Sequence, residues 1–355
     1  MSPRPTRRAL IATCLQATSA LATLPAVAAP RSQTCGLVIH SYAVRNAADR
    51  SLPAGDRLAD AHRFLAHGQA LGFAGVQVAI GIREHRDADA LKRRAEAAGM
   101  YLEGIVSLPR DHADLDRFEA EVRTAKQAGA SVIRTVMLSG RRYETFATLA
   151  AFRRFAESSW NSLSLAAPVA ARHGVRLAVE NHKDWRSEEQ IKLLKQLKCD
   201  HVGVCLDTGN NMSLLEDPMD VVEALAPWAF TTHLKDMGLE EYRDGFLLAE
   251  VPLGTGVLDL PRVVRTLRSA NAEIHFNLEM ITRDPLQVPC LSSRYWETFP
   301  DLPGRHLARA LRLVREHPLV HPLPRVSRLP KNDQLREENE NIDKCLTFAH
   351  TRLGL

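Results

Sequence analysis

Residues 175–207 read VRLAVENHKDWRSEEQIKLLKQLKCDHVGVCLD, and this stretch decides the fold. It opens with a short apolar run ending in Glu180, continues through an amphipathic segment over 187–197, and closes with a second apolar run ending in Asp207. Short runs rich in Val, Leu and Ile, each followed by a longer amphipathic segment, are typical of strands buried on both faces and covered by helices. The stretch therefore predicts one β/α unit of a parallel sheet.

The same pattern recurs along the chain. Gly72, Gly99, Gly129 and Gly174 each follow a helical pattern and precede a strand, where a left-handed helix cap favours glycine. Eight units over about 250 residues predict an α/β fold, a (β/α)8 TIM barrel. An open doubly wound sheet is the alternative, disfavoured because no G-x-G-x-x-G follows the first strand. The predicted strands span 37–43, 75–80, 100–108, 131–138, 175–180, 202–207, 230–235 and 273–280.

The predicted barrel covers residues 36–316. After its last strand, residues 281–300 are rich in proline, aromatic and polar residues, which is consistent with a substrate lid or with an irregular connection. Residues 317–355 form a C-terminal extension, first Pro-rich and then helical over 333–351, which we expect to pack outside the barrel.

The first thirty residues differ from the rest. Arg7 and Arg8 precede an apolar, Ala-rich stretch over 9–24, and Ala26-Val27-Ala28 follows. This order predicts a signal peptide over 1–30, of the twin-arginine type, with an ordinary signal and a chance arginine pair as the alternative. We therefore expect an exported protein, periplasmic or secreted. No later stretch reaches the roughly 18 apolar residues of a membrane span.

Charge and cysteine content exclude some classes of partner. The chain has 46 Lys and Arg against 42 Asp and Glu, and cleavage near Ala28 would leave 43 against 42. Such a balance gives no electrostatic footprint for nucleic acid. The five remaining cysteines are odd in number and lack C-x-x-C spacing, so neither a disulfide framework nor a structural zinc site is expected.

Four predicted strands end in residues that an apolar run does not tolerate without a partner: Glu180, Asp207, His233 and Glu279. Spacings of 27 and 26 residues place the first three at equivalent heights on strands five, six and seven. Glu279 follows from strand eight after an apparent insertion over 237–257. Each residue alone is more often structural, but four at consecutive strand ends predict a site for one divalent metal ion, Mn2+, Mg2+, Co2+ or Zn2+.

Five segments carry a resemblance to a known family: Val-Glu-Asn-His over 179–182, Cys-Leu-Asp-Thr-Gly-Asn over 205–210, Thr-His-Leu-Lys-Asp over 232–236, Pro-Leu-Gly-Thr-Gly over 252–256 and Leu-Glu-Met over 278–280. In this order they resemble the xylose isomerase-like TIM-barrel superfamily, in its sugar phosphate isomerase/epimerase branch, over about residues 36–315. The resemblance implies that Glu180, Asp207, His233 and Glu279 bind the metal. It also implies that Glu180 and Glu279 are catalytic and exchange protons with the substrate.

Four further residues are predicted to contact substrate. His182 and Lys235 each lie two residues beyond a metal-ligand candidate, and Arg283 follows strand eight, although loop residues of this kind are as often simply exposed. Asn210 occupies the position where relatives of the epimerases carry a histidine in an Asp-x-x-His pattern. That departure puts ketose 3-epimerase specificity in doubt.

The leading hypothesis is a metal-dependent sugar isomerase or epimerase that removes a proton next to a carbonyl and proceeds through an enediolate. A lyase or hydrolase of keto-glycosides keeps the metal and changes the reaction, and an exported location favours it. An endonuclease IV-like phosphodiesterase is disfavoured by Asn210 and by the charge balance, and a non-catalytic periplasmic sugar-binding protein by the two carboxylates. The expected partner is a small-molecule sugar or glycoside; a homo-oligomer remains open.

Overall fold

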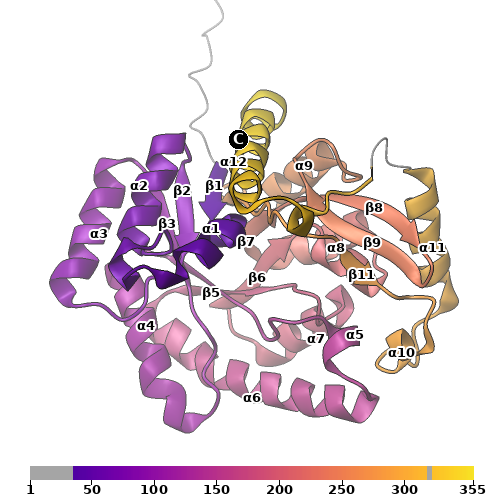
Figure 1. Cartoon of the computed structure of the whole chain (residues 1–355). Coiled ribbons are helices and arrows are strands. Elements are labelled where there is room, and N and C mark those ends of the chain that lie inside the picture. The colour runs from indigo at the N-terminus through magenta and orange to yellow at the C-terminus, as the bar shows by residue number, and fades with distance from the viewer. Residues whose placement is uncertain (1–34, 318–321) are drawn as a thin grey trace, which may run out of the picture. The chain divides into compact units, whose positions relative to one another are not determined.

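Eight parallel strands close into a barrel (Figure 1), as predicted. The computed structural model describes residues 35–317 and 322–355, and the signal peptide predicted over 1–30 lies outside them. Around the barrel the strand order is β1-β10-β7-β6-β5-β4-β3-β2. The strands are β1 Cys35–Val38, β2 Gly75–Val78, β3 Tyr101–Ile105, β4 Val132–Thr135, β5 Arg176–Glu180, β6 Val202–Asp207, β7 Ala229–Leu234 and β10 Phe276–Leu278.

Helices follow most of the strands and end where their caps allow. Asp60 accepts hydrogen bonds from the backbone N–H groups of His62 and Arg63 at the start of α2, and Gly72 ends that helix with φ +84°. The helices are α1 Ala43–Ala48, α2 Ala61–Leu71, α3 His85–Ala97, α4 Leu115–Gln127, α5 Arg142–Thr145, α6 Leu149–His173, α7 Ser187–Leu197, α8 Pro218–Leu225, α9 Leu260–Ala270, α10 Ser293–Trp296, α11 Gly304–Glu316 and α12 Lys331–Phe348.

The first strand is shorter than predicted. Residues 39–42, expected to continue it, form a 3-10 turn that leads directly into α1. Ile39 and Tyr42 are nevertheless buried. An apolar run indicates that residues are buried, but it does not distinguish a strand from a buried turn. The predicted strand was therefore too long at its carboxyl end.

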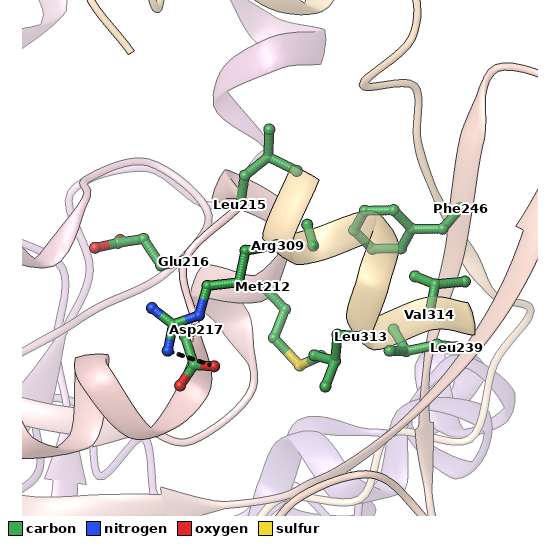
Figure 2. Close-up of a pocket in the computed structure, with 10 residues that line it drawn as sticks. Met212, Leu215, Glu216, Asp217, Leu239, Phe246, Arg309, Leu313 and Val314 are labelled. Carbon is green, nitrogen blue, oxygen red and sulfur yellow. Dashed lines mark ion pairs between the residues drawn. The ribbon is translucent and has the colours of Figure 1, made fainter. Parts of the chain in front are cut away.

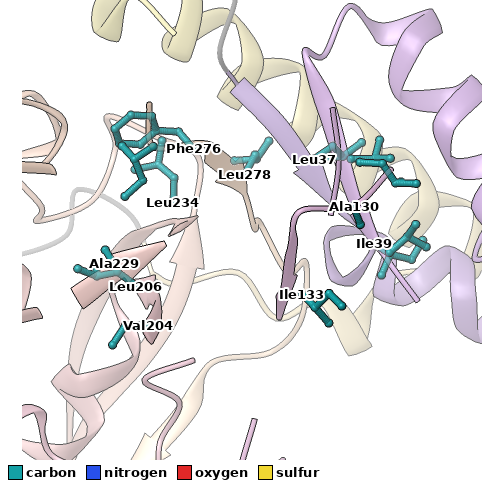
Figure 3. Close-up of a cluster of buried hydrophobic side chains, with 14 of the residues drawn as sticks. Leu37, Ile39, Ala130, Ile133, Val204, Leu206, Ala229, Leu234, Phe276 and Leu278 are labelled. Atoms are coloured by element: carbon teal, nitrogen blue, oxygen red, sulfur yellow. The ribbon is translucent and has the colours of Figure 1, made fainter. Parts of the chain in front are cut away.

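The main apolar core lies between the strands and the surrounding helices. Because successive side chains of a strand point to opposite faces, Val204 and Leu206 share one face of β6, and Cys205 and Asp207 share the other. Val204 and Leu206 join the main core cluster with Leu234, Phe276 and other strand residues (Figure 3). The opposite face of the strands lines the barrel interior, where buried polar side chains such as Gln77, Glu103, Arg134 and Asn277 lie.

The insertion after the seventh barrel strand forms a second, antiparallel sheet. Residues 237–257 contain most of a hairpin, β8 Asp236–Tyr242 and β9 Gly245–Val251. The segment 281–300, expected as a loop, contributes β11 Leu286–Val288 to this sheet and also contains α10. Three-residue strands are too short for a reliable periodicity signal, so the sequence did not reveal this one.

Helix α11 covers the second sheet. Leu313 and Val314 on α11 line a small pocket of about 20 Å³ together with Leu239 and Phe246 of the sheet, and Arg309 pairs with Asp217 at 3.1 Å at its edge (Figure 2). That volume holds little more than one water molecule, so the pocket is no substrate site.

The C-terminal helix belongs to the main core. Ile342 and Cys345 of α12, with Ala349, Leu353 and Leu355 beyond it, join the same buried cluster as the barrel strands. The extension is thus more closely joined to the barrel than the sequence suggested. Within the described residues, no helix has the length and apolarity needed to cross a membrane.

Candidate metal centre

The four predicted metal ligands converge at the carboxyl-terminal rim of the barrel. Asp207 and His233 are register partners on β6 and β7, while Glu180 ends β5 and Glu279 directly follows β10. All four are buried, and one ligand atom from each lies within 4.8 Å of the others. The strand-end spacing therefore predicted their convergence.

The histidine lies at the centre of this group. Its Nδ1 is 3.5 Å from Glu180 Oε2, 3.9 Å from Asp207 Oδ2 and 3.4 Å from Glu279 Oε1, all too long for strong hydrogen bonds. His233 Nδ1 has no hydrogen-bond partner among the described residues, and Asp207 Oδ2 is contacted by Lys235 Nζ at 2.9 Å. Three carboxylates and one imidazole with an orphaned buried nitrogen fit a divalent cation that prefers oxygen ligands.

The electrostatics also favour a cation at this position. Burial by itself raises the pKa of Glu180, but Arg134 and His233 outweigh it and hold that pKa well below its usual range. Burial lowers the pKa of His233, yet the Cys205 thiol and the carboxylates of Glu279 and Glu180 raise it well above the usual histidine range. A site that makes an imidazole retain its proton is one that stabilises positive charge.

Lys235 adds a permanent positive charge beside the four candidate ligands. Its Nζ is 2.9 Å from Asp207 Oδ2 and 2.6 Å from Glu279 Oε2. Burial opposes this charge, but Asp207 and Glu279 together raise the pKa of Lys235 above its ordinary value. The ammonium group therefore contacts a different oxygen of Glu279 from the one that faces His233.

The side chain of Asn210 forms hydrogen bonds with three charged side chains. Its Oδ1 accepts hydrogen bonds from the ammonium groups of Lys183 and, at 3.3 Å, Lys235, while its Nδ2 donates to Glu180 Oε1 at 2.9 Å. An imidazole in its place would not offer this combination of one acceptor for two ammonium groups and one donor to a carboxylate. Direct contact between Asn210 and a substrate stays a prediction.

The other two predicted substrate residues occupy different surroundings. His182 is half-buried, its Nδ1 has no hydrogen-bond partner among the described residues, and burial lowers its pKa to about 3. Arg283 spans both oxygens of Glu250 on β9, at 3.1 and 2.6 Å. Glu250 Oε1 is in turn 3.6 Å from Lys235 Nζ, so Arg283 connects to the centre through two ion pairs.

Sequence reasoning missed Arg134, His40, Lys183 and Gln77. Arg134 on β4 donates a hydrogen bond from Nε to Glu180 Oε2 at 2.7 Å. Burial lowers the pKa of His40 to about 4, with Arg134 and Glu279 among its charged neighbours. Gln77 on β2 bonds His233 at 2.7 Å. A charged or amide side chain inside a predicted buried strand, as at Arg134 and Gln77, was the available signal.

A closed eight-stranded parallel barrel with three carboxylates and an imidazole at its carboxyl-terminal rim defines the chain as a TIM-barrel protein with a candidate divalent-metal centre. The chain belongs to the xylose isomerase-like TIM barrel family, whose model matches residues 65–317. This confirms the family predicted from the sequence.

Comparisons with individual proteins agree with the fold. A xylose isomerase-like TIM-barrel protein from Mycobacterium smegmatis in complex with magnesium is 17% identical, with a TM-score of 0.53 over 79% of this chain and 98% of that one. D-psicose 3-epimerase, solved in the presence of D-fructose, is 15% identical, with a TM-score of 0.57 over 91% of this chain and all of that one, 100%.

A curated relative is 3-oxo-isoapionate decarboxylase from Pectobacterium atrosepticum, 26% identical over 188 residues. The match covers 52% of this chain and 63% of that relative's length.

Proposed function

We propose that the chain is a divalent-metal-dependent sugar isomerase or epimerase that moves a proton at a carbon next to a carbonyl. One observation carries the proposal: Glu180 and Glu279 each bring a carboxylate oxygen close to His233 Nδ1, at 3.5 and 3.4 Å, within one group of candidate metal ligands. A sugar held there would have a carboxylate available at each face. Two opposed bases are the requirement of a reaction that removes a proton and returns it elsewhere.

Different residues of the chain would carry out the different parts of this reaction. When bound, a divalent cation polarises the substrate carbonyl and stabilises the negative charge of the enediolate. Glu279 pairs with Lys235 through Oε2 and faces His233 with Oε1, and we assign it the proton transfer on its side of the substrate. Glu180, fixed by Arg134 and Asn210, serves the opposite face. Return of the proton to the same carbon gives epimerisation, and return to the neighbouring carbon gives isomerisation.

The second candidate is a lyase that breaks a bond next to a ketone in an oxidised sugar or keto-glycoside. The curated decarboxylase relative favours it, because its name describes a 3-oxo substrate. Proton removal beside a ketone begins both isomerisation and β-elimination, so the same two carboxylates serve either one; decarboxylation forms the enolate by loss of CO2 and needs an acid only to protonate it. Mass spectrometry of the products distinguishes them: isomerisation conserves the substrate mass, whereas elimination or decarboxylation divides it.

The test combines metal exchange with one substitution. The purified protein is treated with chelator, reloaded with Mg2+, Mn2+, Co2+ or Zn2+, and assayed on free keto-sugars and keto-glycosides by mass spectrometry and by deuterium uptake from heavy water. We expect turnover to require metal. Glu279→Gln should lower kcat by about 10³-fold, in the range of a lost acid/base group. Glu297→Gln, at an exposed glutamate, is the matched control.

Full activity in a protein shown to be metal-free, or an unchanged kcat in the Glu279→Gln variant, would overturn the proposal. A protein that binds keto-sugars but turns none over, with or without metal, would instead be the sugar-binding protein that the sequence leaves as an alternative.

A further inference from the structure

A large cavity lies between α1, the loop after the last barrel strand and the C-terminal extension. It has a volume of about 830 Å³, within the range of roughly 300–1,000 Å³ typical of small-molecule sites. Its walls are α1, the loop 282–284 after the last barrel strand, and residues 326–335 of the C-terminal extension. We call it the α1–α12 cavity. In Figure 1, α12 lies close to α1.

The α1–α12 cavity lies at the same rim of the barrel as the candidate metal ligands. Helix α1 follows β1 after one short turn, and the loop 282–284 follows Glu279 by three residues. Strands β1 and β10 are neighbours in the barrel. Arg283 in the cavity wall pairs with Glu250, which faces Lys235, and Lys235 pairs with Glu279. These ion pairs link the cavity wall at Arg283 to the candidate metal centre.

Hydrogen bonds fix the positions of the three cavity walls relative to one another. Glu338 of α12, fully buried, accepts from the backbone N–H groups of Val44 at 2.6 Å and Arg45 at 3.0 Å and so caps α1. Asn341 Nδ2 donates to Thr282 Oγ1 at 3.1 Å. Because each wall is fixed to α12 or to the barrel, the space does not depend on a ligand to stay open.

The wall on α1 is apolar. Ala43, Val44, Ala47 and Ala48 occupy one face of the helix, and the three alanines are exposed although their side chains are apolar. Leu335 faces the same space from α12. None of the described residues that line the cavity is aromatic. A second sugar ring commonly packs on an aromatic side chain, so the wall fits methyl, methylene or aryl groups better than another sugar.

The charged side chains of the wall are mostly neutralised before any ligand binds. Arg283 already pairs with both oxygens of Glu250. Asp284 accepts hydrogen bonds from the backbone N–H and hydroxyl of Ser327, at 2.8 and 2.6 Å. Lys331, which also lines the cavity, is exposed. The interior of the cavity therefore selects for an uncharged group.

We propose that the α1–α12 cavity binds the uncharged, apolar aglycone of a glycoside whose sugar ring reacts at the metal centre. This inference rests on the proposed function and narrows its substrate class from free sugars to glycosides. The C-terminal extension, which supplies one wall and the cap of α1, becomes a determinant of that specificity.

The test fills the cavity from two sides. Ala47→Trp on α1 and Asn332→Trp at the start of α12 each place a large ring in the space, while Ala97→Trp on the exposed face of α3 is the matched control. The probes are a free keto-sugar, the same keto-sugar with a phenyl group on its anomeric oxygen, and the corresponding sugar phosphate. We expect the wild-type KM for the phenyl glycoside to be about tenfold below that for the free sugar.

Each cavity variant should raise the KM for the phenyl glycoside about tenfold and leave kcat/KM for the free sugar unchanged, and Ala97→Trp should alter neither. Equal effects on both sugars, no effect on either, or a preference for the sugar phosphate would overturn the inference while the proposed function still stands.

If no sugar is turned over with any metal, the proposed function fails, and titration calorimetry with an unreactive phenyl glycoside then decides on the cavity. Binding by the wild type that both cavity variants lose supports the aglycone site. Undetectable binding, or equal binding by wild type and variants, rejects it.

Discussion

Gln77 orients the histidine at the candidate metal centre. Its Nε2 donates to Glu103 Oε2 at 2.9 Å, and because a carboxylate only accepts, the amide oxygen is left to face His233 Nε2 at 2.7 Å. His233 must then carry a proton on Nε2, which leaves Nδ1 directed at the three carboxylates. Glu103 is itself held by Thr231 and Asn277. This arrangement is the outer support that metal-binding histidines generally need.

Gln77→Leu should therefore weaken metal binding by about 10- to 100-fold, because the imidazole loses the acceptor that fixes its orientation. Chelator-competition titration of the variant measures the affinity. Thr231→Val is the control, since it removes a different hydrogen bond to Glu103 and leaves the Gln77–His233 contact intact. Equal metal affinity in the wild type and the Gln77→Leu variant would show that His233 needs no such support.

Lys183 gives a pH-dependent contribution to stability. Burial, aided by Lys235, lowers its pKa from 10.5 to about 8. Below pH 8 the folded protein carries this buried charge at a cost. From pH 8 to 10.5 the unfolded chain retains the proton that the folded chain has released, so stability rises with pH across this window.

Lys183→Met should thus be more stable than the wild type at pH 7, by a margin on the order of 3 kcal/mol at most. The margin should shrink as pH rises from 8 to 10.5. Urea unfolding of both metal-free proteins across this range measures the free energy of unfolding. Lys195→Met, at an exposed lysine, should show no such trend, and a margin independent of pH would contradict the assignment.

At the scale of an element, the loop after β9 is organised around one carboxylate. Asp236 Oδ2 accepts from the backbone N–H groups of Gly254 and Gly256, both at 2.9 Å, and Oδ1 from those of Met237 and Leu258, at 2.9 and 3.1 Å. Gly254 has φ +84°, a conformation that side chains disfavour. The Lys-Asp and Pro-Leu-Gly-Thr-Gly segments are therefore two halves of one loop anchor.

Gly256→Ala should destabilise the protein by about 2 kcal/mol or more, because a Cβ at this position would lie 2.2 Å from Asp236 Oδ1 and separate the backbone from its anchor. Thermal unfolding measures the loss. Gly55→Ala is the control, since its Cβ would meet nothing within 4 Å and its φ is not in the left-handed range. Equal melting temperatures of the Gly256→Ala variant and the wild type would rule out this role.

At the scale of the whole molecule, the core continues beyond the segment that matches the family model. That match ends at residue 317, yet Ile342 and Cys345 of α12 are buried with the barrel strands. Phe348 contacts the loop at Gly254, where an added Cβ would lie 2.1 Å from its ring. The C-terminal extension therefore contributes side chains to the main core and covers part of it.

Ile342→Ala should lower the free energy of unfolding by about 2–4 kcal/mol, the usual cost of emptying a core position. Lys344→Ala, on the exposed face of the same helix, should change it by less than about 0.5 kcal/mol. Urea unfolding compares the two variants with the wild type. A small effect of Ile342→Ala would mean that α12 unfolds independently of the barrel.

Much of the fold could be predicted because it depends on local patterns. Each of the eight predicted strands overlaps an observed one, and the four strand-end residues Glu180, Asp207, His233 and Glu279 meet as their spacing indicated. The apolar runs recur at a nearly constant spacing, which the sequence shows directly. Because the parallel strands of a barrel bring their carboxyl ends to one rim, that spacing also predicts which strand-end residues meet.

Tertiary structure alone decided which side chains pair with one another at that rim. Arg134 against Glu180, Asn210 between two lysines, and Gln77 behind His233 join residues 25 to 156 positions apart on different strands and loops. The same is true of β11 in the second sheet and of α12 over α1. Sequence period reports which face of an element is buried, whereas the partner of each buried charge is set by barrel closure, which no local pattern records.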